Sequence, residues 1–160
     1  MALSYRLNRL GVRFAPAGPH DRQKIKVLLT SCDLPGEDIE PHLSNFIVAK
    51  IDDRLVGAIG FEKLGKACLL RSFAVDRDYR SKGIANELLN QIMTLARKRD
   101  IKESYLLTTT IAESCLKAGF KAIERANIPK IIQRTEEFRS LCPKTAVCLY
   151  RVISTPSLSK

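Results

Sequence analysis

Apolar residues along the chain follow two spacings, one typical of strands and one typical of helices. Short apolar runs bounded by turn residues predict strands, and apolar positions three and four residues apart predict helices. The predicted strands are 12–15, 45–51, 54–62, 67–75, 104–110, 121–125 and 145–153. The predicted helices are 21–31, 39–45, 84–99, 113–118 and a stretch near 129–139.

The three strands in the middle of the chain are joined by short turns at 52–53 and 64–66. Turns of this length join antiparallel neighbours, so these strands are expected to form an antiparallel meander. The chain shows no internal repeat and no linker. The pattern therefore predicts a single α+β domain over residues 1–160, with a mixed central β-sheet of about six to seven strands flanked by helices.

Length and cysteine content narrow the class of protein. The longest apolar run in the 160 residues is far shorter than the roughly 20 that a membrane-spanning helix needs. The five cysteines form no C-x-x-C pair, and only two histidines accompany them. We therefore expect reduced thiols, a cytoplasmic location, no membrane association and no metal site. Residues 1–10 are expected to be an N-terminal extension, and a targeting role for them stays open.

The net charge of +10 indicates an anionic partner. The cations are spread along the chain, without a block of like charge or a basic stripe with interleaved aromatic residues. No nucleic-acid partner is therefore expected. A polyphosphate cofactor would use the same field.

Candidate chemistry lies in the turn V-D-R-D-Y-R-S-K-G-I-A (75–85), which joins a strand to a helix. It contains the pattern R-x-x-G-x-A, formed by Arg80, Gly83 and Ala85. The amino end of a helix has unpaired N–H groups and partial positive charge, so it stabilises an anion such as phosphate. A glycine lets the backbone approach such a ligand closely. The alternative is a tight connection whose glycine serves only the turn and whose cations are solvated.

Three motifs together give a family resemblance. Residues 69–89, L-L-R-S-F-A-V-D-R-D-Y-R-S-K-G-I-A-N-E-L-L, resemble the acetyl-CoA signature of the GNAT N-acetyltransferases, in which Q/R-x-x-G-x-G/A surrounds the pyrophosphate. S-C-L-K-A-G-F (114–120) is similar to that family's F-Y-x-K-x-G-F. The tail E-F-R-S-L-C-P-K-T-A-V-C-L (137–149) resembles the arsenic-resistance-linked N-acetyltransferases, which are related to the acetyltransferase domain of N-acetylglutamate synthases.

The resemblance implies acetyl-CoA as acyl donor and a small, amino-acid-like acceptor whose primary amine attacks the thioester directly. Backbone groups of the strand end would pair with the pantetheine arm, and amides of the turn would hold the pyrophosphate. The residues assigned to the cofactor in this way are Phe73, Ala74, Val75, Arg80, Ser81, Lys82, Gly83, Ile84 and Ala85.

Three residues are candidates for proton transfer. Cys115 occupies the place of the family's tyrosine and is the candidate general acid, with a space-filling role as the alternative. Glu62 and His42 are candidate general bases, and histidine titrates near neutrality. Their alternatives are a surface carboxylate and an exposed helix residue, and a base acting through water would leave no sequence signal.

Arg71 lies inside the apolar strand L-L-R-S-F-A-V, where an unpaired charge would be costly to bury. Its guanidinium could bind the carboxylate of an amino-acid acceptor in bidentate fashion, or it could lie on a solvated face of the sheet. Thr108 and Thr109 are expected to line the same slot. Cys142 alone makes a weak arsenic site, so a metal role is not expected. A protein or peptide acceptor, a non-catalytic acyl-CoA-binding regulator and a homodimer stay open as alternatives.

Overall fold

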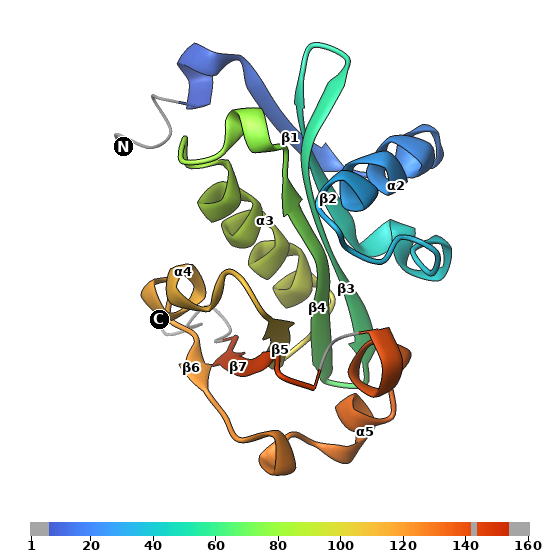
Figure 1. Cartoon of the computed structure of the whole chain (residues 1–160), viewed down its shortest axis with the longest axis vertical. Helices are drawn as coiled ribbons and strands as arrows, with labels where there is room; N and C mark the ends of the chain where they lie inside the picture. Colours follow the sequence, from blue (N-terminus) through green and yellow to red (C-terminus); the bar gives the residue numbers. More distant parts are fainter. Residues whose placement is uncertain (1–6, 142–143, 154–160) are drawn as a thin grey trace, which may run out of the picture. The chain divides into compact units, whose positions relative to one another are not determined.

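The computed structural model of the protein describes residues 7–141 and 144–153, and Figure 1 labels its main elements. The strands are β1 (Val12–Pro16), β2 (Phe46–Ile51), β3 (Arg54–Leu64), β4 (Ala67–Val75), β5 (Glu103–Thr108), β6 (Lys121–Ala122) and β7 (Val147–Val152). The helices are α2 (Arg22–Ser31), α3 (Ile84–Lys98), α4 (Ala112–Lys117) and α5 (Lys130–Gln133). Shorter helical turns are Pro19–Asp21, Glu40–Asn45, Arg77–Tyr79, Arg125–Asn127 and the π-helical turn Glu137–Leu141.

The seven described strands form one mixed sheet in the order β1-β2-β3-β4-β5-β7-β6. The β2–β3 pair is antiparallel, as the short turn at 52–53 predicts, and β1 is antiparallel to β2. β4 and β5 run parallel, because the connection between them contains α3 and is long enough for a crossover. β7 is antiparallel to both β5 and β6. This arrangement confirms the predicted α+β class and the number of strands.

The chain divides into two compact units, and β3 and β4 contribute residues to both. One unit comprises the residues up to Phe61 together with Ser72–Thr94. The other comprises Glu62–Arg71 and the residues from Leu95 onward. The residues predicted to bind the cofactor therefore belong to the first unit, and most of those predicted to bind the acceptor or transfer protons belong to the second.

In the first unit, α2 packs its apolar side against the sheet (Figure 1). The buried helix residues are Ile25, Leu28 and Leu29, which is the face that the sequence predicts. They share one apolar cluster with Ile39, Phe46, Val48, Leu55, Ala58 and Ala74. Burial of these side chains from α2 and from β2, β3 and β4 holds the first unit together.

The start of α2 is fixed by Asp21, which is 1% exposed. Its carboxylate accepts a hydrogen bond from the Gly18 amide at 2.8 Å. The ammonium of Lys50 on β2 lies 2.7 Å from the other carboxylate oxygen. Burial alone would raise the pKa of Asp21, but the Lys50 contact and the Gly18 amide outweigh it and lower that pKa. A buried charge with both partners in place thus joins the helix start to the sheet.

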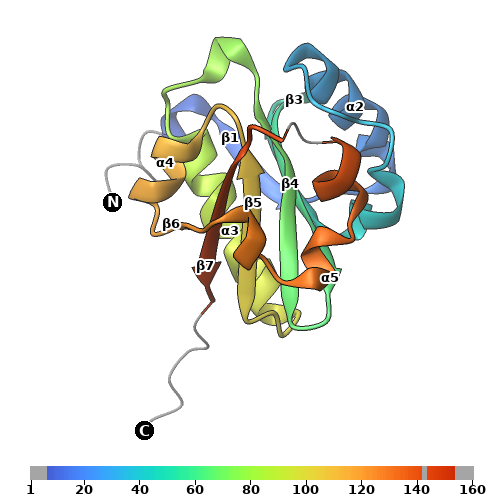
Figure 2. The same ribbon diagram turned by 60° about the horizontal axis from the view of Figure 1, so that its bottom comes forward.

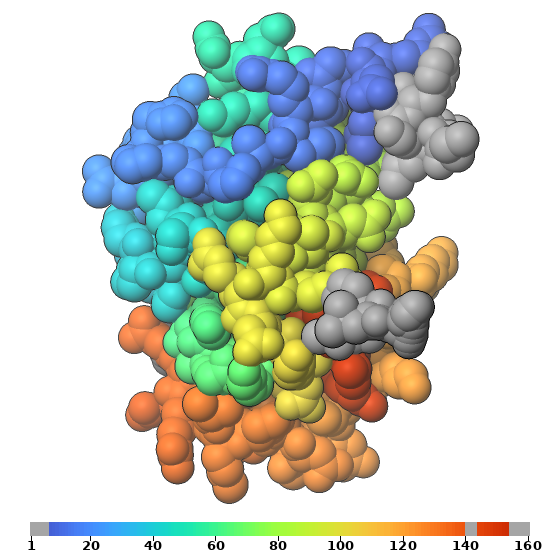
Figure 3. Space-filling view, turned by 180° about the vertical axis from the view of Figure 1, so that it is seen from behind, coloured from blue at the N-terminus to red at the C-terminus, as the bar shows by residue number. Residues whose placement is uncertain are grey.

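The 15 residues of α3 present an apolar stripe along one side. The buried positions are Ile84, Leu88, Leu89, Ile92, Met93 and Ala96, as the periodicity predicts. Gly57 on β3 allows a close approach, because a Cβ there would lie 2.9 Å from Leu88 and 3.2 Å from Ile84. Polar residues such as Asn86, Asn90 and Thr94 are exposed, and Figure 3 shows residues of this helix, in lime to yellow, at the surface.

In the second unit, β5 and β7 pair along their full lengths, and β6 adds two residues beside β7 (Figure 2). The rings of Tyr105 and Tyr150, directly opposite in this pairing, stack with centroids 6.3 Å apart. One apolar cluster joins these strands to β4 and α5. Its buried members are Ala67, Leu69, Tyr105, Leu107, Ile128, Ile132, Ala146 and Cys148.

Short elements differ most from their predicted bounds. The helix predicted at 39–45 is the 3₁₀ turn Glu40–Asn45, and the helix predicted near 129–139 is divided into α5 and the π-helical turn. The strand predicted at 121–125 pairs over Lys121–Ala122 alone. Such short segments take their conformation from tertiary contacts more than from their own residues.

Two predictions fall on other parts of the chain. Cys142 and residues 1–6 of the predicted extension lie outside the described residues. Of the rest of that extension, residues 7–10 are helical and Leu7 is 4% exposed. Among the described helices, none has both the length and the apolar character needed to span a bilayer.

Candidate active site

The last residues of β4 differ in conformation from the strand before them. Ser72 has a φ of +55°, in the left-handed region, which costs a serine on the order of 1 kcal/mol. The pairing of β4 with β5 runs from Ala67↔Glu103 to Leu70↔Leu106, so Phe73–Val75 lie beyond the last of these pairs. On the side of β3, the Asp76 amide donates to the Val56 carbonyl at 2.8 Å. The strand end predicted to pair with pantetheine is thus set by a local backbone irregularity, which the sequence alone does not indicate.

The loop before α3 has two residues in the left-handed region. Ser81 has a φ of +63° and Gly83 a φ of +96°. The Gly83 carbonyl accepts from the Glu87 amide at 3.2 Å, so Gly83 is the residue directly before the helix and accepts its first hydrogen bond. The unpaired N–H groups at the start of a helix carry partial positive charge and stabilise an anion nearby. The predicted phosphate loop therefore has a backbone suited to holding an anion.

Exposure along this loop also suits a ligand-binding role. Ser81, Lys82 and Ala85 are exposed and Gly83 is half-buried. Ile84 is 1% exposed and anchors the first turn of α3 in the core. The loop is thus fixed by one buried side chain, while its polar groups stay accessible.

Arg80 extends back toward the end of β4. Its Nε donates to the Val75 carbonyl at 3.0 Å, and one terminal nitrogen lies 3.5 Å from the Cys32 sulfur, which follows α2. The Cys32 sulfur is also 3.8 Å from the Val75 carbonyl. Arg80 thus connects the loop, the strand end and the end of α2. The sequence indicated the charge of Arg80, whereas the contact with Cys32 could not be predicted from it.

Arg71 is buried in the second unit, with only 2% of its surface exposed. A terminal nitrogen of its guanidinium lies 3.9 Å from a carboxylate oxygen of Glu137, which is 8% exposed. The location excludes the solvated face that the sequence left as an alternative for Arg71. Glu137 was not among the predicted site residues, and its only signal is its place in the motif E-F-R-S-L-C-P.

The two threonines predicted to line the slot differ in their surroundings. Thr108 is 8% exposed, and its hydroxyl accepts from the amides of Thr110 and Ile111 at 3.2 and 3.1 Å. Thr109 is exposed. Thr108 therefore caps the turn that leads from β5 to α4, and contact of either hydroxyl with an acceptor stays a prediction.

The three candidates for proton transfer occupy different environments. Cys115 on α4 is 1% exposed, and burial raises the pKa of its thiol to about 11. A thiol of that pKa is a weak proton donor, so the geometry fits the space-filling alternative well. Glu62 on β3 is half-buried and lies in the second unit with Cys115 and Arg71. His42 is half-buried in a 3₁₀ turn of the first unit. The catalytic roles of all three stay predictions.

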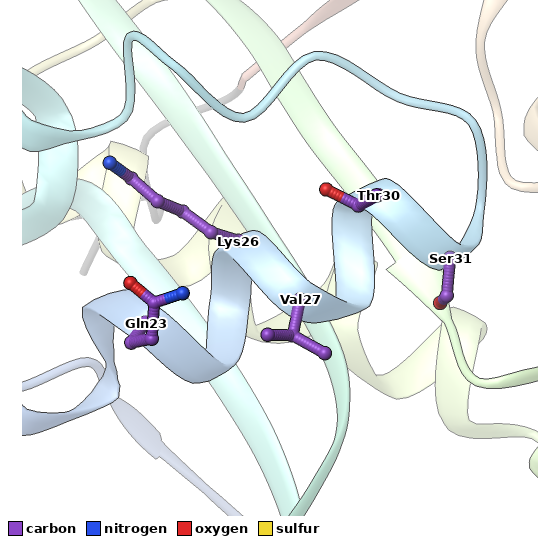
Figure 4. Close-up of a pocket in the computed structure, with 5 residues that line it drawn as sticks. All are labelled: Gln23, Lys26, Val27, Thr30 and Ser31. Atoms are coloured by element: carbon purple, nitrogen blue, oxygen red, sulfur yellow. The ribbon is translucent and has the colours of Figure 1, made fainter.

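A separate hollow of about 370 Å³ lies along α2. Figure 4 shows its lining side chains, which all come from this one helix: Gln23, Lys26, Val27, Thr30 and Ser31. Lys26 forms an ion pair with Glu40. A hollow with a single wall and no cluster of titratable groups does not resemble a catalytic site.

Comparison with known proteins gives one family and one fold. A sequence model of the acetyltransferase (GNAT) family matches residues 14–120. An uncharacterized N-acetyltransferase of Chlorobaculum tepidum is 30% identical over 114 residues, which cover 70% of each chain.

Solved structures of similar fold share about a fifth of the residues. The N-acetylglutamate synthase of Neisseria gonorrhoeae, solved with coenzyme A and N-acetyl-glutamate, superposes with a TM-score of 0.78 at 20% identity. The match covers 89% of this chain and 35% of the synthase, so the chain spans about a third of that protein's length. A Mycobacterium tuberculosis protein solved in complex with coenzyme A gives a TM-score of 0.75 at 19% identity, over 89% of this chain and 99% of that one.

Proposed function

The chain belongs to the GNAT acetyltransferase family, and on that premise we propose that it transfers the acetyl group of acetyl-CoA to the primary amine of a small, amino-acid-like acceptor. The observation that carries the acceptor class is Arg71, a guanidinium buried in the strand whose end would hold the donor. Guanidinium groups bind carboxylates in bidentate fashion, and a buried one does so with little competition from water. Support comes from the gonococcal synthase, a neighbour in fold solved with coenzyme A and N-acetyl-glutamate.

In this proposal the chain orients the donor through its backbone. The strand end Phe73–Val75 pairs with the pantetheine arm, and the amides of the loop from Arg80 to Ala85 hold the pyrophosphate at the start of α3. Support for the second role is the place of the loop at the start of α3, where unpaired amides stabilise an anion, and the glycine at position 83, whose φ is +96°. Acetyl-CoA supplies the activated acyl group when bound.

The chemical step needs a neutral amine and a protonated leaving group. The amine attacks the thioester carbon, the C–S bond breaks, and the amine's proton leaves while the thiolate gains one. We assign removal of the ammonium proton to Glu62 or His42, directly or through water. The thiolate takes its proton from water or from Cys115.

Titration calorimetry followed by a free-thiol assay tests the proposal. We expect acetyl-CoA to bind in the micromolar range, and thiol release with amino acids to exceed that with the matching amides and decarboxylated amines. A panel of peptides serves as comparison. Preference for the peptides would contradict the small acceptor, and binding without transfer to any amine would indicate a regulator in place of an enzyme. A cytoplasmic location stays a prediction.

A further inference from the structure

The segment that joins β4 to α3 has no residue in the apolar core. Every residue from 76 to 83 is exposed or half-buried, whereas Val75 before them is 8% exposed and Ile84 after them is 1% exposed. Burial of an apolar side chain therefore fixes each end of the segment but none of the residues between. Polar contacts must set the path of these residues, which include the first part of the loop proposed to hold the pyrophosphate.

Asp76, the first residue of this segment, uses all of its polar groups in hydrogen bonds. Its amide donates to the Val56 carbonyl of β3 at 2.8 Å, and its carbonyl accepts from the Tyr79 amide at 2.9 Å. One carboxylate oxygen accepts from the Asp78 amide at 2.9 Å, and the other accepts from the Arg54 guanidinium at 2.8 Å. The carboxylate thus caps the helical turn that follows it and joins that turn to β3.

The guanidinium of Arg54 also contacts the rest of this turn. One of its terminal nitrogens lies 3.7 Å from a carboxylate oxygen of Asp78, and its central carbon lies 5.2 Å from the centre of the Tyr79 ring. Figure 1 shows the turn, in lime, between the end of β4 and the start of α3. One side chain from β3 thus holds three residues of a segment that has no apolar anchor of its own.

The carboxylate of Asp76 is partly shielded from water. The Arg54 side chain is 54% exposed, but that of Asp76 is 20% exposed, so the pair differs from an ion pair on the open surface. Burial alone would raise the pKa of Asp76, but the Asp78 amide and the Arg54 guanidinium outweigh it and lower that pKa. Asp76 is therefore ionised at neutral pH, in the form that accepts from both partners.

The position of the turn matters because of what lies on either side of it. Phe73–Val75 before the turn and the loop from Arg80 to Ala85 after it are the two segments proposed to bind the donor. The pantetheine and pyrophosphate of coenzyme A belong to one molecule, so the two segments must lie at the spacing of these two groups. A displacement of about 1 Å between them would weaken binding strongly, and a rigid turn avoids the cost of ordering the loop around the ligand.

We propose that Asp76, paired with Arg54, is a positioning residue for the donor, which holds the loop from Arg80 to Ala85 at the spacing that coenzyme A requires. This inference rests on the proposed function, since it assumes that the strand end binds pantetheine and the loop binds pyrophosphate. Asp76 acts through the turn and not by contact with the donor, whose phosphates its carboxylate would repel.

The test is Asp76→Ala, with Asp78→Ala as matched control, because Asp78 lies in the same turn, has an 80% exposed side chain and loses the same charge. For Asp76→Ala we expect the Kd of coenzyme A, measured by calorimetry, to rise about tenfold, because the turn loses its cap and its link to β3. Loss of a negative charge alone would act in the opposite direction, since it favours an anionic ligand. Asp78→Ala should therefore leave this Kd unchanged or lower it. Asp76→Asn keeps an oxygen that can accept from the Asp78 amide, so its Kd should rise only about threefold.

Pantetheine, which lacks the phosphates, separates the loop from the strand end. Its Kd, measured by displacement titration, should change less than about twofold in Asp76→Ala, because the strand end stays in place. General damage to the first unit would weaken both ligands by the same factor. Thermal unfolding of each variant shows whether it is folded at the temperature of the titration.

An unchanged Kd of coenzyme A in folded Asp76→Ala overturns the proposal, and so does an equal rise for coenzyme A and pantetheine. An equal rise in Asp76→Ala and Asp78→Ala overturns it as well. Where Asp76→Ala does not fold, the decision passes to Asp76→Asn, and a Kd equal to that of the unmodified protein overturns the proposal. If the unmodified protein binds coenzyme A no more tightly than pantetheine, the proposed pyrophosphate loop itself fails. If it does bind coenzyme A more tightly and Asp76→Ala preserves this difference, only the role of Asp76 fails.

Discussion

The proposed pyrophosphate loop contains Gly83, whose backbone conformation favours glycine over any other residue. With a φ of +96° it adopts a backbone conformation that costs an alanine on the order of 1 kcal/mol or more. The Gly83→Ala variant would relieve this strain by shifting the loop, which would turn its amides away from a bound pyrophosphate. We expect the KM of acetyl-CoA to rise about tenfold and the acceptor KM to change little, in steady-state kinetics.

Gly65 offers a matched control for this substitution. It also has a positive φ, +66°, but it lies in the turn between β3 and β4, and a Cβ there would meet no atom within 4 Å. Gly65→Ala should lower the free energy of unfolding by a similar amount without changing the KM of acetyl-CoA. Equal effects of the two variants on that KM would mean that the loop does not bind the cofactor.

The buried thiol of Cys115 predicts a pH dependence of the protein's stability. Burial raises the pKa of its thiol from 9.0 to about 11, so the unfolded chain loses this proton before the folded one does as the pH rises. The stability it contributes is fully present below pH 9 and is lost between about pH 9 and 11. Between about pH 8 and 10, the free energy of unfolding of Cys115→Ala should therefore fall by roughly 1 kcal/mol less than that of the unmodified protein. Urea unfolding at the two pH values measures this difference.

Other groups titrate in the same range, and burial raises the pKa of the Cys68 thiol to about 12. The comparison is therefore between variants at each pH and not between pH values alone. Ser114→Ala, an exposed neighbour on α4, should follow the unmodified protein at both pH values. If the free energy of unfolding fell equally in Cys115→Ala and in the unmodified protein, the assignment of this pH dependence to Cys115 would be contradicted.

Among the contacts between elements, those of Arg80 allow the effect of its positive charge to be separated from the effect of its hydrogen bonds. Its guanidinium contacts the Val75 carbonyl through Nε and the Cys32 sulfur through a terminal nitrogen, and the compact ammonium of a lysine does not reproduce this planar arrangement. Arg80→Lys keeps the charge but loses one of these contacts, so the loop, β4 and α2 would be joined less firmly. We expect the affinity for coenzyme A, measured by calorimetry, to fall about fivefold to tenfold.

Arg77→Lys is the matched control, because Arg77 is 67% exposed and its terminal nitrogen lies 3.7 Å from an oxygen of Asp33. Such an exposed pair contributes little, so this variant should bind coenzyme A as the unmodified protein does. Full affinity in Arg80→Lys would show that only the positive charge of Arg80 matters.

The elements that the sequence predicted best are those with many residues of one pattern. The stripe from Ile84 to Ala96 repeats one signal several times, and it was confirmed together with the antiparallel β2–β3 pair of the meander. Ser72 and Glu137 gave no such signal. The left-handed backbone at Ser72 and the contact of Glu137 with Arg71 depend on residues far apart along the chain, so only the folded structure reveals them.

The net charge of the whole molecule, +10, attracts an anionic donor such as acetyl-CoA. Ionic screening shortens the range of this field, since the Debye length falls from about 30 Å at 0.01 M salt to about 8 Å at 0.15 M. We therefore expect kcat/KM for acetyl-CoA to fall several-fold between about 0.01 and 0.15 M salt. Initial rates measured at a fixed acceptor concentration test this.

Acetyl-pantetheine is the control for this experiment, because it carries the same thioester without the phosphates. Its kcat/KM should be lower throughout and should change little with salt, since the field of the protein does not act on an uncharged donor. Equal salt dependence for the two donors would mean that the salt acts on the fold or on the acceptor. Competition by duplex DNA with acetyl-CoA at low salt would instead assign the basic charge, at least in part, to a nucleic acid.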